Sequence, residues 1–242
     1  MLRFLARRSG ALHSRGGLEI CVSGMQLLFD DPDGDLGACV EVLVARAYEQ
    51  RPEFVPGPDA RVLDGGANVG LYAMAQAKRG AHVVAFEPHP LAYQRLQEHV
   101  SKNKLAHRIK CINAALGGAT GVGYFHSSGK WHAAHLAEGA GPSIEEVQVL
   151  SLDDALEASG LDRVDILKLD IEGAEEDLLS SAGPSLDRVG ALVLERHYPH
   201  DVRKTLAYRG LHLLPGGSDP NVEYYGRDVS KAAAALPVIG GV

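Results

Sequence analysis

The chain has few cysteines, no excess of basic charge and no long apolar segment, and each absence narrows what it can be. Its three cysteines stand singly among 242 residues, without C-x-x-C or metal-ligand spacing, which indicates a reducing compartment rather than a disulfide framework. The formal net charge of −7 argues against broad binding to nucleic acid or to an anionic membrane surface. No stretch approaches the roughly 18 apolar residues that cross a bilayer, and the basic N-terminal segment lacks the apolar core of a signal peptide. We therefore expect a cytoplasmic protein without nucleic-acid or membrane partners.

What the chain does contain is typical of one well-packed domain, because 45% of its residues are hydrophobic and 23% are charged. Residues 1–58 are expected to form an N-terminal arm, a hairpin that turns at Ser23-Gly24, and a helix over 36–51. Residues 59–228 are expected to form the main domain, and 229–242 a tail. The hairpin and the leading helix are the surfaces that we expect a homodimer to use, although the sequence leaves the oligomeric state open.

From residue 61 onward, apolar runs alternate with helix-like segments. The expected strands are 61–64, 82–86, 109–113, 122–126, 145–150, 164–169, 191–195, 211–214 and 222–226. The expected helices are 69–78, 90–104, 152–158, 174–181 and 201–208. Such alternation predicts an α/β fold in which a doubly wound, mostly parallel sheet carries helices on both faces.

A glycine-rich turn follows the strand over 61–64. It reads Asp64-x-Gly66-x-Asn68-x-Gly70, so it is neither G-x-G-x-x-G nor a triphosphate-binding loop, which would end in G-K-[ST]. Glycines permit close approach of a ligand, and the helix that follows presents unpaired N–H groups. Glu87 comes 23 positions after Asp64, at the end of the second strand, where a carboxylate can bind the two hydroxyls of a ribose. The pattern favours a nucleoside without phosphates; the alternatives are a ligand-free strand-to-helix connection and a simple surface acid.

Five segments together resemble the FkbM family of S-adenosylmethionine-dependent methyltransferases. They are Leu63–Gly70, Phe86–Pro88, Ala114–Gly117, Leu167–Glu175 and Leu194–His197. The L-K-x-D-I-E-G-x-E pattern of the fourth segment is the most specific, and the resemblance runs from about Tyr48 to about Tyr208. It implies a class I, Rossmann-like fold with a seven-stranded sheet, and S-adenosylmethionine as cofactor. Family members mostly methylate hydroxyls on sugars, polyketides or other secondary metabolites, and sometimes nitrogen.

The resemblance also implies where the cofactor binds. The methionine portion would lie against the glycine turn, the ribose on Glu87 with Pro88 shaping the bend, and the adenine near Asn113 and Ala114. The turn residues that carry over are Asp64, Gly65, Gly66, Ala67, Asn68 and Gly70. Gly65 departs from the family pattern, which more often has a bulkier residue there. Asp170 is expected to position the cofactor or the acceptor.

Methyl transfer to a hydroxyl needs alignment of the acceptor and either a general base or a Lewis-acid metal. The candidates follow two adjacent strands: Asp170, Glu172, Glu195 and His197. We expect His197 to be the base, with Glu172 as the alternative; Glu172 and Glu175 can also be first-turn acids that stabilise a helix N-terminus.

A divalent ion such as Mg²⁺ is a further alternative that the sequence does not favour. Its ligands would be Asp170, Glu172 and Glu195, and Arg196 is a competing cation for these carboxylates.

A long loop with the one tryptophan of the chain, Trp131, is expected to capture the acceptor. Two H-x-x-H pairs, His132 with His135 and His197 with His200, lack the H-E-x-x-H signature, so zinc is not expected. The main prediction is therefore a methyltransferase that acts on a small hydroxylated acceptor. The alternatives are N-methylation, an NAD-dependent dehydrogenase, and a non-catalytic binding module.

Overall fold

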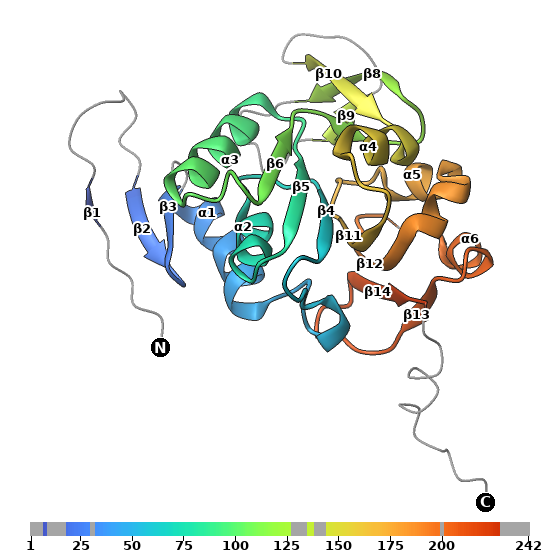
Figure 1. Cartoon of the computed structure of the whole chain (residues 1–242). Helices are drawn as coiled ribbons and strands as arrows, with labels where there is room; N and C mark the ends of the chain where they lie inside the picture. Colours follow the sequence, from blue (N-terminus) through green and yellow to red (C-terminus); the bar gives the residue numbers. More distant parts are fainter. Residues whose placement is uncertain are drawn as a thin grey trace, which may run out of the picture.

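A computed structural model describes residues 7–8, 18–29, 32–126, 135–137, 144–198 and 201–227. Its largest feature is a seven-stranded sheet in the order β13-β14-β12-β11-β4-β5-β6 (Figure 1). The strands are β4 (Arg61–Gly65), β5 (His82–Phe86), β6 (Ile109–Ile112), β11 (Val164–Leu169), β12 (Val189–Glu195), β13 (His212–Leu214) and β14 (Val222–Gly226). Six of these strands point the same way, five of them as parallel neighbours, and β14 is antiparallel to both β12 and β13. The expected α/β fold with a mostly parallel, Rossmann-like sheet is confirmed.

Helices cover both faces of this sheet (Figure 1). They are α2 (Leu71–Lys78), α3 (Pro90–Lys102), α4 (Leu152–Ser159), α5 (Glu175–Ser181) and α6 (Arg203–Tyr208), with short 3-10 helices η2 (Pro52–Phe54) and η4 (Gly183–Arg188). Successive residues of the central strands pack into different cores: Val62 joins the core under α2 and α3, whereas Leu63 joins the core under α4 and α5. Strands buried on both faces need apolar residues at successive positions, as Val62 and Leu63 provide in β4 and Ile166 and Leu167 in β11.

The front of the chain shares the first of these cores. Strands β2 (Leu18–Val22) and β3 (Met25–Phe29) form the expected hairpin, and its turn residues Ser23 and Gly24 both have positive φ. Buried residues of the hairpin pack in one cluster with residues of α2 and α3. The backbone N–H of Leu28 also donates to the ring of His99 on α3, at 2.9 Å. Strand β1 (Arg7–Arg8) pairs with β2.

The helix expected over 36–51 is wrong in its bounds. The structure has α1 (Pro32–Cys39), which continues as the π-helix η1 (Val40–Ala45) and ends at Arg46 with φ +54°. This left-handed residue turns the chain so that Tyr48 and Glu49 are buried instead of continuing along the helix. The front segment therefore contributes the side chains of Tyr48 and Glu49 to the interior of the protein.

A second, four-stranded sheet lies beside the main one, in the order β7-β10-β8-β9. Its strands are β7 (Ala115–Leu116), β8 (Gly121–His126), β9 (His135–Ala137) and β10 (Ile144–Leu150). Trp131, His132 and His200, and with them most of the predicted acceptor loop, lie outside the described residues. Within the described ranges, every helix is too short or too polar to cross a bilayer.

Candidate active site

The glycine-rich turn lies where β4 ends, at the edge of the sheet formed by the carboxyl ends of the parallel strands. The backbone N–H groups of Gly66 and Ala67 donate to the carbonyl of Phe86 at 3.1 and 2.9 Å, which ties the turn to β5. Gly66 has φ +72°, and a Cβ there would lie 1.7 Å from the backbone oxygen of Asp170. Only glycine fits this position, because the turn packs directly on the end of β11.

Two further features of the turn suit a bound nucleoside with an amino-acid tail. Asn68 has φ +52°, and its Oδ1 is buried without a hydrogen-bond partner among the described residues. Buried acceptors are rarely left unpaired, so Asn68 is a place for a ligand donor. Gly70 precedes α2, whose first N–H groups point towards the same turn. The turn therefore offers hydrogen-bonding groups that suit the predicted cofactor.

Glu87 lies beside the turn at the end of β5. Its Oε2 accepts from the backbone N–H of Asn68 at 2.7 Å, and its Oε1 accepts from that of His89 at 2.8 Å. Burial raises the pKa of Glu87 to about 7, against the opposing effect of these two N–H groups. Each carboxylate oxygen has a second lone pair available for a ribose hydroxyl. Glu87, the residue predicted to bind the ribose, therefore lies next to the turn that is predicted to bind the methionine portion.

The predicted adenine neighbours have mainly structural contacts. The side-chain N–H₂ of Asn113 donates to the carbonyls of Glu87 and Pro88, at 2.8 and 3.0 Å, and so holds the bend after β5. Ala114 is buried in the core under α4 and α5. Their role towards an adenine stays a prediction.

Lys168 and Asp170 join the turn to the end of β11. Lys168 is buried, and its Nζ lies 2.9 Å from the carbonyl oxygen of Gly66, 3.3 Å from Asp64 Oδ1 and 3.4 Å from Asp170 Oδ2. Burial disfavours its charge, but the two carboxylates outweigh this effect and hold the pKa of Lys168 above its ordinary value. Lys168 thus neutralises the buried carboxylate of Asp64, whose own pKa is raised by burial.

Tyr48 is a site residue that the sequence reasoning missed. Its hydroxyl lies 3.0 Å from Asp170 Oδ2 and 2.5 Å from Glu195 Oε2, and its ring lies under the ammonium of Lys168 at 5.0 Å. Only 2% of Tyr48 is exposed. It comes from the front segment, 122 positions before Asp170, where no local pattern marks it. The start of the family resemblance near Tyr48 was the one signal available.

His197 lies among three acids. Its Nδ1 is 3.1 Å from Glu175 Oε1, and its Nε2 is 3.5 Å from Asp170 Oδ1 and 3.4 Å from Glu172 Oε2. The hydrogen bond with Glu175 raises the pKa of His197 to about 9, although burial opposes the shift, and the charges of the surrounding carboxylates add to it. A pKa of about 9 favours the protonated ring at neutral pH, and the role of His197 as general base stays a prediction.

The acids at the ends of β11 and β12 lie close enough to interact. Burial, followed by nearby charges that include Asp170, raises the pKa of both Glu172 and Glu195. Arg196, expected to compete for these carboxylates, points elsewhere: its guanidinium lies 3.7 Å from Glu223. The site is thus rich in carboxylates, with Lys168 and His197 as its nearest cations.

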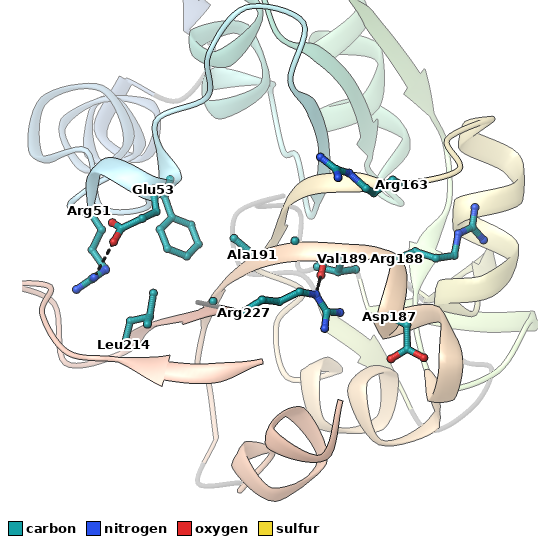
Figure 2. Close-up of a pocket in the computed structure, with 12 residues that line it drawn as sticks. Arg51, Glu53, Arg163, Asp187, Arg188, Val189, Ala191, Leu214 and Arg227 are labelled. Atoms are coloured by element: carbon teal, nitrogen blue, oxygen red, sulfur yellow. Dashed lines mark hydrogen bonds and ion pairs between the residues drawn. The ribbon is translucent and has the colours of Figure 1, made fainter. Parts of the chain in front are cut away.

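A separate cavity of about 400 Å³ lies at the opposite edge of the sheet (Figure 2). Its lining includes Arg163, just before β11, and Val189, the first residue of β12. Phe54, Leu214 and Arg227 also line it. Because the predicted site residues follow the carboxyl ends of the strands, this cavity is not the site that the sequence predicts.

Comparison with known proteins agrees with this arrangement. The sequence model of the family described as "Methyltransferase FkbM domain" matches residues 64–214, more than half of the chain. The chain belongs to the FkbM methyltransferase family.

The similar proteins are distant relatives. AMB antimetabolite synthetase AmbE of Pseudomonas aeruginosa is 29% identical over 66% of this chain, and the match covers 9% of AmbE. Methyltransferase sdnD of Sordaria araneosa is 26% identical over 59% of this chain and 68% of sdnD. The 2-O-methyltransferase NoeI of Sinorhizobium fredii is 25% identical over 62% of this chain and 68% of NoeI. This FkbM protein is therefore a methyltransferase by family.

Proposed function

We propose that this FkbM protein transfers the methyl group of S-adenosylmethionine to a hydroxyl of a small metabolite. One observation carries the proposal: the Glu87 carboxylate, the turn over 66–70 and the acids after β11 and β12 meet at one edge of the sheet. The residues that would hold the cofactor are Glu87 for the ribose and Asn68 with the N-terminus of α2 for the methionine portion. The sulfonium supplies an activated methyl group, so the protein has mainly to align an acceptor with it.

The proton of the acceptor must leave as the new C–O bond forms. The pKa of about 9 favours a His197 ring that already carries a proton of its own, whereas the carboxylates of Glu172 and Glu195 have raised pKa values and are therefore stronger bases than ordinary surface acids. We infer that one of these two carboxylates receives the proton. The relative NoeI, described as a 2-O-methyltransferase, supports oxygen as the acceptor atom.

Methylation of nitrogen is the second candidate, because the carboxylate-rich site would also attract an ammonium group. Membership of a methyltransferase family favours both candidates over an NAD-dependent dehydrogenase.

Binding and turnover together test the proposal. Calorimetric titration of the full chain with S-adenosylmethionine and with NAD should show binding of the first alone. Incubation with methyl-labelled cofactor and a panel of polyols, phenols and amines should label a hydroxylated compound. The variant Glu87→Gln tests the ribose contact, and Glu98→Gln, at an exposed position, is its control. Absence of cofactor binding would overturn the assignment, and labelling of amines alone would favour the second candidate.

A further inference from the structure

The two nitrogens of His197 have different surroundings. Nδ1 lies 3.1 Å from Glu175 Oε1, within hydrogen-bond range. Nε2 lies 3.5 Å from Asp170 Oδ1 and 3.4 Å from Glu172 Oε2, beyond the usual N–H···O range of about 2.7–3.2 Å. Nε2 thus faces two carboxylate oxygens without a well-formed hydrogen bond to either.

The two separations from Nε2, 3.5 and 3.4 Å, are close to those between neighbouring ligands of one metal ion. Ligand atoms about 2.1 Å from a central ion lie roughly 3.0 Å apart in octahedral geometry and roughly 3.4 Å apart in tetrahedral geometry. One ligand atom each from Asp170, Glu172 and His197 lies within 4.8 Å of the other two. The three atoms can therefore reach one ion with small side-chain movements.

Glu175 gives the ring the orientation that a metal ligand needs. It is completely buried, and its Oε1 also accepts from the backbone N–H of Ile171 at 3.0 Å, so the carboxylate is fixed. A carboxylate that accepts from Nδ1–H leaves the lone pair of Nε2 free once the second proton is displaced. Carboxylate–histidine–metal arrangements orient ligands in this way.

The backbone at Glu172 is shaped to present its carboxylate. Glu172 has φ +54°, an uncommon value for a residue with a side chain, and Gly173 follows with φ +105°. The side chains remain partly open, with exposed fractions of 26% for Asp170, 42% for Glu172 and 20% for His197. An ion bound here would keep open positions for water or for a hydroxyl.

We propose that Asp170, Glu172 and His197 bind a divalent cation of the Mn²⁺ or Mg²⁺ class, beside which the acceptor hydroxyl is held. This ligand set differs from the one that the sequence suggests, since Glu195 is engaged by Tyr48 and His197 takes its place. Carboxylates suit both cations, whereas an imidazole ligand suits transition metals, so Mn²⁺ fits this set better than Mg²⁺, with water in the remaining positions.

The proposal rests on the proposed function and assigns its acids separate roles. A divalent cation lowers the pKa of a coordinated hydroxyl. The O–H bond then breaks and its proton passes to the Glu195 carboxylate, while an oxygen lone pair forms the bond to the methyl carbon. The C–S bond breaks with its electron pair remaining on sulfur, so the products are a methyl ether, a thioether nucleoside and a protonated Glu195.

Manganese binding is the direct test, because electron paramagnetic resonance detects free Mn²⁺ without any substrate. The full chain, dialysed against EDTA and then freed of chelator, should bind one Mn²⁺ per chain. His197→Gln should weaken that affinity at least about tenfold, because loss of even an outer-shell partner of a metal site costs that much. His107→Gln, on an exposed loop before β6, is the matched control and should bind as the unaltered protein does.

The outcomes separate this proposal from the proposed function. Cofactor binding is measured on the same samples and should persist in His197→Gln, which also shows that the variant is folded. Turnover should fall after dialysis and return with Mn²⁺ or Mg²⁺. Absence of Mn²⁺ binding, equal affinity in His197→Gln, or full turnover after dialysis would overturn the metal site and leave the methyltransferase proposal standing. Failure to bind S-adenosylmethionine would overturn the proposed function instead.

Discussion

At the scale of single residues, Tyr48 has the most unusual position. A phenol carries one hydrogen, yet the hydroxyl of Tyr48 lies within hydrogen-bond distance of both Asp170 and Glu195. It can donate to one carboxylate only, so the other must carry a proton or go without this donor.

Replacing Tyr48 should therefore affect turnover more than cofactor binding. Tyr48→Phe keeps the ring over Lys168 but removes the hydrogen bond, which for a charged partner is worth about 1.5–3 kcal/mol, or roughly ten- to a hundredfold in rate. Steady-state kinetics should show this loss in kcat, with cofactor affinity nearly unchanged. Tyr208→Phe, whose residue is 84% exposed, serves as the control. Equal turnover in both variants would remove Tyr48 from the site.

The raised pKa of Glu87 predicts how cofactor binding depends on pH. With a pKa of about 7, its carboxyl is mostly protonated below that pH and ionised above it. Ribose hydroxyls donate to the ionised form, so binding should release a proton. Affinity should fall as the pH drops below about 7, by up to about tenfold per unit. Titrations between pH 5.5 and 8.5 should show this slope, and Glu87→Gln should bind weakly with little dependence on pH. A flat profile in the unaltered protein would contradict the ribose assignment.

At the scale of elements, the turn after β4 and the end of β11 fit together as one unit. The sequence predicts the strands and helices of this region well, because their apolar periodicity is strong. The prediction from sequence fails at the helix over 36–51, because no residue around Arg46 marks the C-terminus of a helix. That helix ends because burying Tyr48 and Glu49 outweighs the local preference to continue, and such tertiary effects are invisible in a local pattern.

Two glycines with similar φ angles test how closely the turn after β4 packs on the end of β11. A Cβ at Gly66 would collide with the Asp170 backbone, whereas Gly160, with φ +74°, has no atom within 4 Å of such a Cβ. Gly160→Ala should cost about 1 kcal/mol of unfolding free energy from backbone strain alone. Gly66→Ala should cost well over about 2 kcal/mol, because the backbone itself must move. Urea denaturation of both variants measures the difference; equal losses would mean that the contact is unimportant.

At the scale of the whole molecule, the sheet brings together residues that are far apart in the sequence. Asp64, Glu87, Asp170 and Glu195 could be predicted to share one edge, because parallel strands align their carboxyl ends. The sequence does not predict that Glu175, Glu172 and His197 meet, because their meeting depends on how the turn after β11 bends back towards the end of β12. The sequence also does not predict that Tyr48 contributes to the candidate active site, because this requires the front segment to be placed against the sheet.

The burial of Tyr48 between Asp170 and Glu195 has a consequence for protein engineering. A chimera that exchanges residues 1–58 with those of a relative would also change the candidate active site. The incoming segment would replace Tyr48, which contacts Asp170 and Glu195. Acceptor preference and the rate of the chemical step should then change together in such hybrids, unless the incoming sequence has a tyrosine in register with the one it replaces.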